Sequence, residues 1–507
     1  MAFNLYDLLT REGEKSPLAP FLHSADGRHF SYRDLAEETA RVANALRQLG
    51  VARGNRVAAQ IPKSAAALML YLGAMRAGAV YVPLNTGYTP SELDYFLADS
   101  DPALVLCDPD AHGAIEPVAV EPGAGRLETM GAHGQGSFAE RIAAADPGFE
   151  SVPMQADDLA SIIYTSGTTG RSKGAMLTLG NLFSNAEALA KAWALTSADR
   201  LLHALPLYHV HGLFVATNTV LSAGASIHLL PHFDVGEVMG LLPESSVMMG
   251  VPTFYIRLLQ SAELTPELAG SMRLFISGSA PLSPDVHAQF VDRTGHAILE
   301  RYGMSETGMM TSNPYDGERR AGSVGFALPC VDLRIADRAT GQEVAQGEVG
   351  MIEVSGPNVF KGYWRKPELT DREFRDDGYF VTGDLGRFDE DGYLWIVGRD
   401  KDLIISGGLN VYPAEIEAAI DAIPGVTESA VIGTPHPDFG EGVTAVVVRE
   451  SGVVLDEQAI ADALESQLAS FKRPKRIFFL DALPRNAMGK IQKNQLRDNY
   501  RDAYEIS

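Results

Sequence analysis

A run of small, hydroxylated and glycine residues that ends in a lysine is the strongest chemical signal in this chain of 507 residues. It follows a short apolar segment, residues 159–164, and ends at Lys173 and Gly174. Glycine lets consecutive backbone N–H groups curl around an anion, hydroxyls add donors, and a lysine adds positive charge. These residue types together favour the binding of nucleotide phosphates. Their spacing differs from that of the common Gly-Lys-Ser/Thr phosphate loop, and the alternative interpretation is a flexible linker.

A second segment, residues 300–307, combines an aromatic ring, a hydroxyl and two carboxylates. Tyr302 offers a flat face to a purine, and the Ser305 hydroxyl can bond a phosphoryl oxygen. Glu306 offers a hard oxygen ligand to Mg²⁺. The alternative is an ordinary helix start with a locally satisfied glutamate.

Three further candidates are isolated charged residues, which in most proteins are simply solvated. Their order along the chain and their sequence neighbours are what point to a functional role. Asp384 follows an apolar run and can accept both hydroxyls of a ribose, and Arg399 stands in a charged segment after a predicted hairpin. Lys490 follows Gly489, which allows a tight turn, so its side chain can reach into the cleft of another domain. An ammonium there would stabilise negative charge as it develops during a reaction.

The elements around these motifs alternate between strand-like and helix-like patterns. We expect strands over 55–61, 79–83, 103–107, 200–204, 246–251 and 273–277, with a helix over 66–76. This rhythm predicts mainly parallel sheets covered by helices. The turn over 277–282 follows a strand directly, which places it at the carboxyl edge where ligands of such sheets bind.

The pattern changes near residue 380. Residues 386–397 read as a hairpin around an Asp-Gly turn, and beyond them we expect helices over 413–423 and 460–468 with strands over 429–433 and 444–449. The sequence therefore predicts an α/β protein. Its large N-terminal domain of mainly parallel sheets covers 1–399, and a small mobile α+β domain covers 400–507.

The composition narrows the possible partners. Lys plus Arg number 42 against 65 for Asp plus Glu, which gives a formal charge of −23. Such a surface repels nucleic acid and anionic lipid, so we expect neither as a partner. Cys107 and Cys330 match no metal or redox spacing, and the first residues lack the pattern of a signal peptide. We expect a cytoplasmic protein.

Taken in order, the motifs from residue 160 to residue 490 resemble those of the adenylate-forming superfamily, which includes acyl-CoA synthetases, luciferases and peptide-synthetase adenylation domains. The resemblance implies an enzyme that joins an acid to CoA through an acyl-adenylate, consuming ATP with Mg²⁺ and releasing AMP and pyrophosphate. It implies Glu306 as the metal ligand, and Lys490 and Arg399 as catalytic residues. Ser305 replaces the usual threonine of the family and keeps its hydroxyl.

The resemblance also implies the remaining site residues. The small domain rotates about Asp400 and Lys401 between the two half-reactions, and it presents Ser406, Gly407 and Gly408 to CoA. The nucleotide-binding residues implied are Thr165, Ser166, Gly167, Thr168, Thr169, Gly170, Lys173, Gly278, Ser279, Ala280, Glu300, Arg301, Tyr302, Gly303, Met304, Ser305, Asp384 and Arg399.

The acid substrate is indicated by Arg301, which stands where many relatives have a small residue near the acyl pocket. A buried guanidinium is costly unless it meets an anion, ideally a carboxylate held by two hydrogen bonds. His209, His211 and Arg257 are candidates for the same pocket. The segments around Arg301 and His209 are similar to those of malonyl-CoA synthetases, which implies malonate, or methylmalonate, as the substrate.

Alternatives remain at this point. Arg301 can instead pair with Glu300 or Asp292, so that the pocket takes a neutral short or medium acyl chain, and Arg257 can be an exposed helix residue. The enzyme can instead load a carrier protein, or the chain can be a non-catalytic sensor of AMP or acyl-adenylate. Lysines at the position of Lys490 are acetylation targets in related synthetases, which implies an acetyltransferase and a deacetylase as partners.

Overall fold

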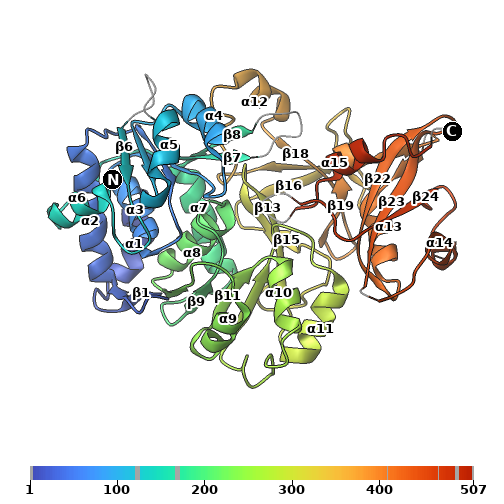
Figure 1. The fold of residues 1–507 in the computed structure, drawn as a ribbon, viewed down its shortest axis with the longest axis horizontal. Coiled ribbons are helices and arrows are strands. Elements are labelled where there is room, and N and C mark those ends of the chain that lie inside the picture. Colours follow the sequence, from blue (N-terminus) through green and yellow to red (C-terminus); the bar gives the residue numbers. More distant parts are fainter. Residues whose placement is uncertain are drawn as a thin grey trace. The chain divides into compact units, whose positions relative to one another are not determined.

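A computed structural model describes residues 4–119, 126–165, 172–407, 409–450, 452–465, 467–485 and 490–504. The chain forms two compact units (Figure 1). The first comprises residues 1–333 and 354–380, and the second comprises 334–353 and 381–507. Residues 381–399, which we expected in the large domain, thus group with the C-terminal residues. The predicted hinge at Asp400 and Lys401 concerns motion, and this division does not test it.

The first unit contains a six-stranded sheet in the order β6-β5-β3-β4-β7-β8. All neighbours are parallel except β7 and β8, which form an antiparallel hairpin. The strands are β3 (Arg56–Gln60), β4 (Val80–Pro83), β5 (Leu104–Cys107), β6 (Arg126–Thr129), β7 (Leu159–Thr165) and β8 (Lys173–Thr178). Helix α2 (Tyr32–Gln48) begins at a capping box in which the side chains of Ser31 and Asp34 bond each other's backbone N–H.

A second sheet of this unit has the order β15-β14-β13-β12-β11-β9-β10-β1-β2. It is parallel from β13 to β1 and antiparallel at both edges. Its strands are β1 (Pro20–Ser24), β2 (His29–Ser31), β9 (Arg200–His203), β10 (Ser226–Leu229), β11 (Val247–Gly250), β12 (Leu274–Ser277), β13 (Leu299–Met304), β14 (Gly308–Ser312) and β15 (Phe326–Ala327). Two mainly parallel sheets confirm the predicted fold class for this part of the chain.

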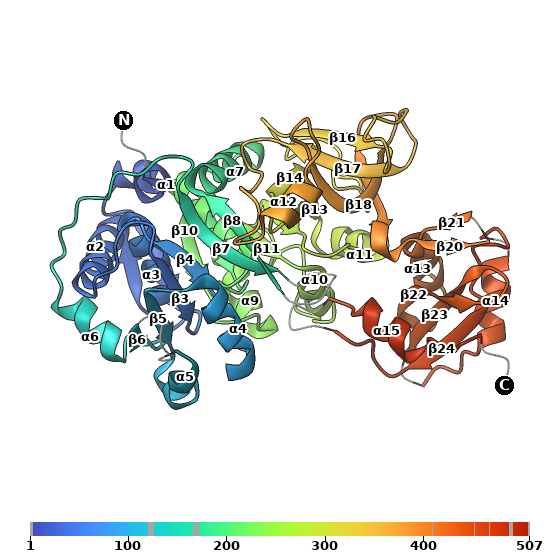
Figure 2. The ribbon, with the colours of Figure 1, turned by 90° about the horizontal axis from the view of Figure 1, so that it is seen from above.

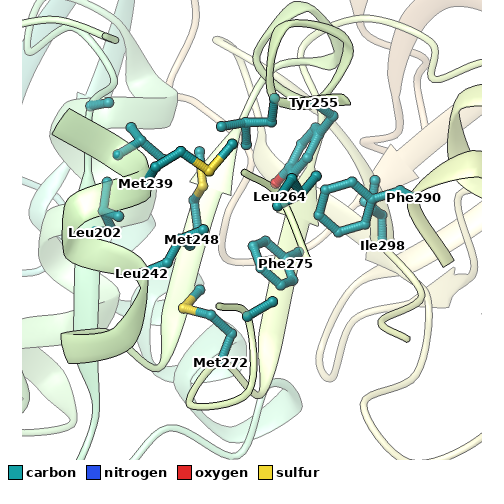
Figure 3. Packing of buried hydrophobic residues seen from close by; sticks show 14 of the residues in the cluster. Leu202, Met239, Leu242, Met248, Tyr255, Leu264, Met272, Phe275, Phe290 and Ile298 are labelled. Carbon is teal, nitrogen blue, oxygen red and sulfur yellow. The ribbon is translucent and has the colours of Figure 1, made fainter. Parts of the chain in front are cut away.

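A hydrophobic core packs against β11 and β12 and reaches Ile298, just before β13. Helices α9 (Val235–Leu241), α10 (Pro252–Leu259) and α11 (Pro284–Thr294) contribute to it together with β11 and β12. Figure 3 shows Tyr255, Phe275 and Phe290 gathered in this core, with Phe290 edge-on to both other rings. The Tyr255 hydroxyl donates to the carbonyl of Ile276 at 2.6 Å. Buried aromatic packing of this kind holds the end of β12, which leads directly into Gly278.

Helices complete the first unit. Those not yet named are α1 (Leu5–Glu14), α3 (Ala65–Arg76), α4 (Pro90–Ser100), α5 (His112–Ala119), α6 (Ser137–Ala144), α7 (Leu179–Ala192), α8 (Thr217–Ser222) and α12 (Pro367–Glu373). A π-helical turn, η2 (His211–Ala216), precedes α8. Wide turns of this type are rare and often occur at functional sites.

The second unit is an α+β structure, shown from above in Figure 2. Strands β16 (Asp332–Ala336), β17 (Gly350–Ser355), β18 (Phe380–Phe388) and β19 (Leu394–Arg399) form one sheet, and β18 and β19 are the predicted hairpin. The other sheet has the order β21-β20-β23-β22, with β24 beside β23. It contains β20 (Ile404–Ser406), β21 (Leu409–Val411), β22 (Val426–His436), β23 (Gly440–Arg449) and β24 (Arg476–Leu480), accompanied by α13 (Pro413–Asp421), α14 (Glu457–Glu465) and α15 (Lys493–Asn499).

Helices long and apolar enough to span a bilayer do not occur among the residues that the structure describes.

Candidate active site

The predicted phosphate loop joins β7 to β8. Thr165 and Lys173 are paired across this hairpin, so they close the base of the loop. The Tyr164 hydroxyl donates to Asp99 Oδ2 at 2.7 Å, and the Tyr95 hydroxyl donates to the carbonyl of Ser172 at 2.7 Å. Helix α4 therefore anchors both ends of the loop. The predicted contacts of Ser166, Gly167, Thr168, Thr169 and Gly170 lie outside the described residues.

The side chain of Lys173 lies in a cluster with Glu306, Tyr363 and Glu373. Lys173 Nζ is 3.0 Å from Glu373 Oε1 and 4.5 Å from the centre of the Tyr363 ring. The Tyr363 hydroxyl is 2.9 Å from Glu373 Oε2 and 3.0 Å from Glu306 Oε1. Burial raises the pKa of Glu306. The structure thus brings the predicted phosphate-binding lysine and the predicted metal ligand into one hydrogen-bonded group.

The segment 300–307 forms the β13–β14 hairpin rather than a helix start. Glu300 Oε1 accepts a hydrogen bond from the backbone N–H of Gly322 at 2.9 Å, and burial raises the pKa of Glu300 to about 7. Tyr302 is buried in the sheet, whereas Gly303 and Met304 are half-buried at its end. The strand ends at the turn that carries Ser305 and Glu306.

Arg301 is buried, with 3% of its surface exposed. Its Nε and Nη2 atoms have no hydrogen-bond partner among the described residues, so the predicted alternative of pairing with Glu300 or Asp292 is not realised there. Gly278 lies directly against the guanidinium: a Cβ on this glycine would be 2.4 Å from Arg301 Cζ. Burial lowers the pKa of Arg301 to about 9. Among the residues that the structure describes, Arg301 is thus a buried cation whose Nε and Nη2 donors are free.

His211 lies close enough to Arg301 to be affected by its charge, and His209 lies close to His211. Loss of hydration first, and then the charge of Arg301, hold the pKa of His211 well below its usual range. Burial lowers the pKa of His209 to about 4, so both imidazoles are neutral at pH 7. His211 Nδ1 is 3.2 Å from Ser279 Oγ, and the Nε2 atoms of both histidines have no partner in the described ranges. Ser279 has φ 71°, a strained conformation for a serine.

Arg257 does not join this group, and that prediction is corrected. Pro252, Tyr255 and Leu258 form the buried face of α10, while Arg257 is exposed on the other side. A helix turns by about 100° per residue, so Arg257 lies far around the axis from Tyr255. The alternative of an exposed helix arginine describes it correctly. Ala280 is likewise exposed, in the turn after β12.

Two residues that the sequence did not single out support the histidine segment. Lys63 Nζ is 2.9 Å from the carbonyl oxygen of His203 and 3.2 Å from its Nδ1 atom. His203 Nε2 is 2.9 Å from the carbonyl oxygen of Gly212, which begins η2 with His211. Lys63 and His203 are 140 positions apart, so no local pattern could have connected them.

The second unit holds the other predicted nucleotide and catalytic residues. Arg399 Nε is 2.7 Å from Asp384 Oδ1, across the β18–β19 pair. The pKa of Lys490 is lowered to about 8, first by loss of hydration around the ammonium and then by the charge of Arg399. Ser406 is buried, and the Gly407 N–H donates to the carbonyl of Phe439 at 2.9 Å. Gly408 lies outside the described residues.

Ion pairs involve one of the two predicted hinge residues and a neighbour of the other. Asp400 pairs with Arg338 at 2.6 Å, and Asp402, next to Lys401, pairs with Arg497 of α15 at 2.7 Å. Within the described part of the chain, no group of three or more His, Cys, Asp or Glu side chains is arranged to hold a metal ion. A cation at Glu306 would therefore need further ligands from a bound nucleotide or from water.

Comparison with known proteins decides the family. Residues 9–364 match the AMP-binding enzymes, and residues 415–490 match the AMP-binding enzyme C-terminal domain. The chain belongs to the AMP-binding enzyme family. It is an AMP-forming acid–CoA ligase with small-molecule substrates.

Individual relatives of this ligase differ in their acids. The crystal structure of ATP-bound MatB from Rhodopseudomonas palustris is 56% identical with a TM-score of 0.97, and each chain is covered completely. Malonate–CoA ligase of Arabidopsis thaliana is 36% identical over 93% of this chain and 85% of its own. Feruloyl-CoA synthase from an Amycolatopsis species is 38% identical over 97% of this chain and 98% of its own. Overall similarity therefore leaves the choice of acid to the pocket residues.

Proposed function

We propose that this ligase makes malonyl-CoA from malonate, ATP and CoA through a malonyl-adenylate. The observation that carries the proposal is the buried guanidinium of Arg301, whose Nε and Nη2 atoms have no partner in the described ranges. A malonate activated at one end still carries a second carboxylate. That carboxylate is the anion that a buried, unpaired guanidinium requires.

The neighbouring histidines favour the same substrate. His209 and His211 are neutral at pH 7, so each can donate one N–H to an anion without adding another buried charge. If Ser279 donates to His211 Nδ1, the proton of this imidazole is on Nε2, which has no partner among the described residues. A carboxylate between His211 and Arg301 would then accept from both. A neutral acyl chain would leave all these donors unsatisfied, at a cost of about 1–3 kcal/mol each.

Several of the predicted charged residues would carry the half-reactions. Lys173 would hold the phosphates of ATP, and Asp384, oriented by Arg399, would accept the ribose hydroxyls. Lys490 would stabilise charge between the attacking carboxylate and the α-phosphate. The buried Glu306 carboxylate suits Mg²⁺, because a cation would offset the desolvation that raises its pKa. When bound, Mg²⁺ would neutralise phosphate charge. The thiol of CoA then attacks the adenylate carbonyl, and AMP leaves.

The first test measures AMP release with ATP, Mg²⁺ and CoA across malonate, methylmalonate, succinate, acetate, butyrate and a cinnamate. Turnover confined to the short dicarboxylates is expected, and methylmalonate shows how much room the pocket leaves beside the central carbon. Arg301→Met should lose malonate turnover far more than any residual turnover of acetate, because only malonate has a second carboxylate for Arg301. Efficient wild-type turnover of acetate, butyrate or the cinnamate, or equal losses in the variant, would overturn the proposal.

The assignment of Lys490 has a separate test. Lys490→Ala should abolish malonate-dependent pyrophosphate release yet spare thioester formation from preformed malonyl-AMP, because the phosphate bond is already broken in that substrate. Equal loss of both half-reactions would contradict the assignment. Rotation about Asp400 and Lys401, CoA contacts at 406–408, acetylation of Lys490 and a cytoplasmic location are proposed with it.

A further inference from the structure

The ammonium of Lys173 is held from two sides by residues outside the phosphate-loop motif. The ring of Tyr363 lies beneath it, with 4.5 Å between Nζ and the ring centre. Glu373, at the end of α12, provides a carboxylate oxygen at 3.0 Å. The Lys173 side chain is only 13% exposed and that of Glu373 is 28% exposed, so solvent screens this pair less than a surface pair.

Both partners of Lys173 are themselves fixed. The Tyr363 hydroxyl lies within hydrogen-bond distance of Glu373 Oε2, which leaves Oε1 of the same carboxylate for Lys173. The backbone N–H of Tyr363 donates to Thr370 Oγ1 at 2.9 Å, which ties this residue to α12. Lysine has a flexible four-carbon stem that otherwise samples many rotamers. Here its end is placed by a preassembled ring and carboxylate.

We propose that Glu373 is a positioning residue: it holds the ammonium of Lys173 against Tyr363 and thereby fixes where that ammonium meets the phosphates of ATP. This rests on the proposed phosphate-binding role of Lys173. An ammonium has three N–H donors. Glu373 accepts one and the ring lies over one side, so donors remain for a phosphoryl oxygen while the side chain stays in place.

The direct test is Glu373→Gln, which preserves shape and removes the charge. Equilibrium binding of a non-hydrolysable ATP analogue with Mg²⁺ should weaken about fivefold, the effect expected from losing one partly buried charge pair. The KM for ATP should rise by a similar factor while the KM for the acid stays unchanged. Glu373→Asp, which keeps the charge, should recover part of the loss. Tighter binding of the analogue to Glu373→Gln would overturn the proposal, because Glu373 would then compete with the phosphates.

A matched control and a double variant separate positioning from a structural role. Glu368→Gln removes the same charge from an exposed position of α12 and should leave binding unchanged. If Glu373 acts through Lys173, Glu373→Gln should weaken binding little further in a Lys173→Met background. A fivefold loss in that background as well would refute the proposal.

The outcomes for the two proposals are distinct. Unchanged analogue binding in Lys173→Met alone would remove the phosphate role of Lys173 and with it the premise. Weakened binding in Lys173→Met together with full binding in Glu373→Gln would remove only the role of Glu373. Should Glu373→Gln fail to fold, Tyr363→Phe keeps the ring and deletes the hydroxyl that holds Glu373. It should weaken binding in the wild-type background, and full binding would count against the proposal.

Discussion

Arg301→Met should make the ligand-free ligase more stable while it abolishes malonate binding. Arg301 has been identified as a buried cation without an anionic partner in the described ranges. Burial lowers its pKa from the ordinary arginine range to about 9. At about 1.4 kcal/mol for each pKa unit, folding with this charge costs about 5 kcal/mol relative to a neutral group.

The direction of this stability change follows from the linkage between proton binding and folding. Because the pKa of Arg301 is depressed in the folded protein, its charged form lowers the stability of the fold by the full amount at every pH below about 9. This penalty fades only as the pH rises toward the ordinary pKa of arginine. Methionine has a similar length and no charge, so the variant escapes the penalty but loses some packing against Gly278. A net gain of about 2–4 kcal/mol is expected at pH 7. For a unit of this size that corresponds to a rise in Tm of roughly 3–8 °C.

The assay is thermal unfolding with and without malonate and ATP. Arg273→Met is the matched control because Arg273 is paired: its Nε and Nη2 atoms lie 2.7 Å and 2.8 Å from the two carboxylate oxygens of Asp199. Removing that arginine leaves the buried carboxylate of Asp199 without its cation and should destabilise the fold by about 3 kcal/mol. The same substitution should therefore have opposite effects at the two sites.

Two results would refute this reasoning. A lower Tm for Arg301→Met would mean that the guanidinium is a structural partner in the free protein. A malonate-dependent stabilisation equal to that of the wild type would mean that Arg301 does not bind the second carboxylate.

Further predictions concern pH and one glycine. The adenylation rate should fall as the pH rises through about 8, where Lys490 loses its proton, and should reach about a tenth of its plateau at pH 9. An active Lys490→Arg variant should keep its adenylation rate at pH 9. The same loss of rate at high pH in that variant would argue against Lys490 as the titrating group. Gly278→Ala should displace the guanidinium of Arg301 and lower the affinity for malonate at least tenfold, which titration calorimetry would measure. The Tm should change little, because the atoms that the new Cβ would meet lie at the end of a flexible side chain. Below pH 6.5 the free energy of unfolding should decrease by about 1.4 kcal/mol per pH unit for each buried neutral histidine, such as His203 and His228. The reason is that the pKa of each is depressed in the folded protein. In urea unfolding, the stability of His228→Gln should therefore depend less steeply on pH than that of the wild type.

Local patterns in the sequence were sufficient for much of the architecture. Strands over buried apolar runs, the capping box at Ser31 and the Asp-Gly hairpin turn each depend on residues a few positions apart. The division between units was harder to predict, because strands β16 to β19 form a sheet from residues before and after 354–380. Strand pairing across such separations has no local signal.

The sequence by itself determined the family and the chemistry, because the motifs occur in a fixed order and their residue types restrict what they can bind. Only the tertiary structure decided which charges are paired. Arg257 faces solvent because of its helical phase, and Arg301 lacks a carboxylate partner in the described ranges despite the adjacent Glu300. Lys173 meets Glu373 across 200 positions. Pairing depends on distance and burial in the folded chain, and these are set by the packing of sheets and helices rather than by neighbours in sequence.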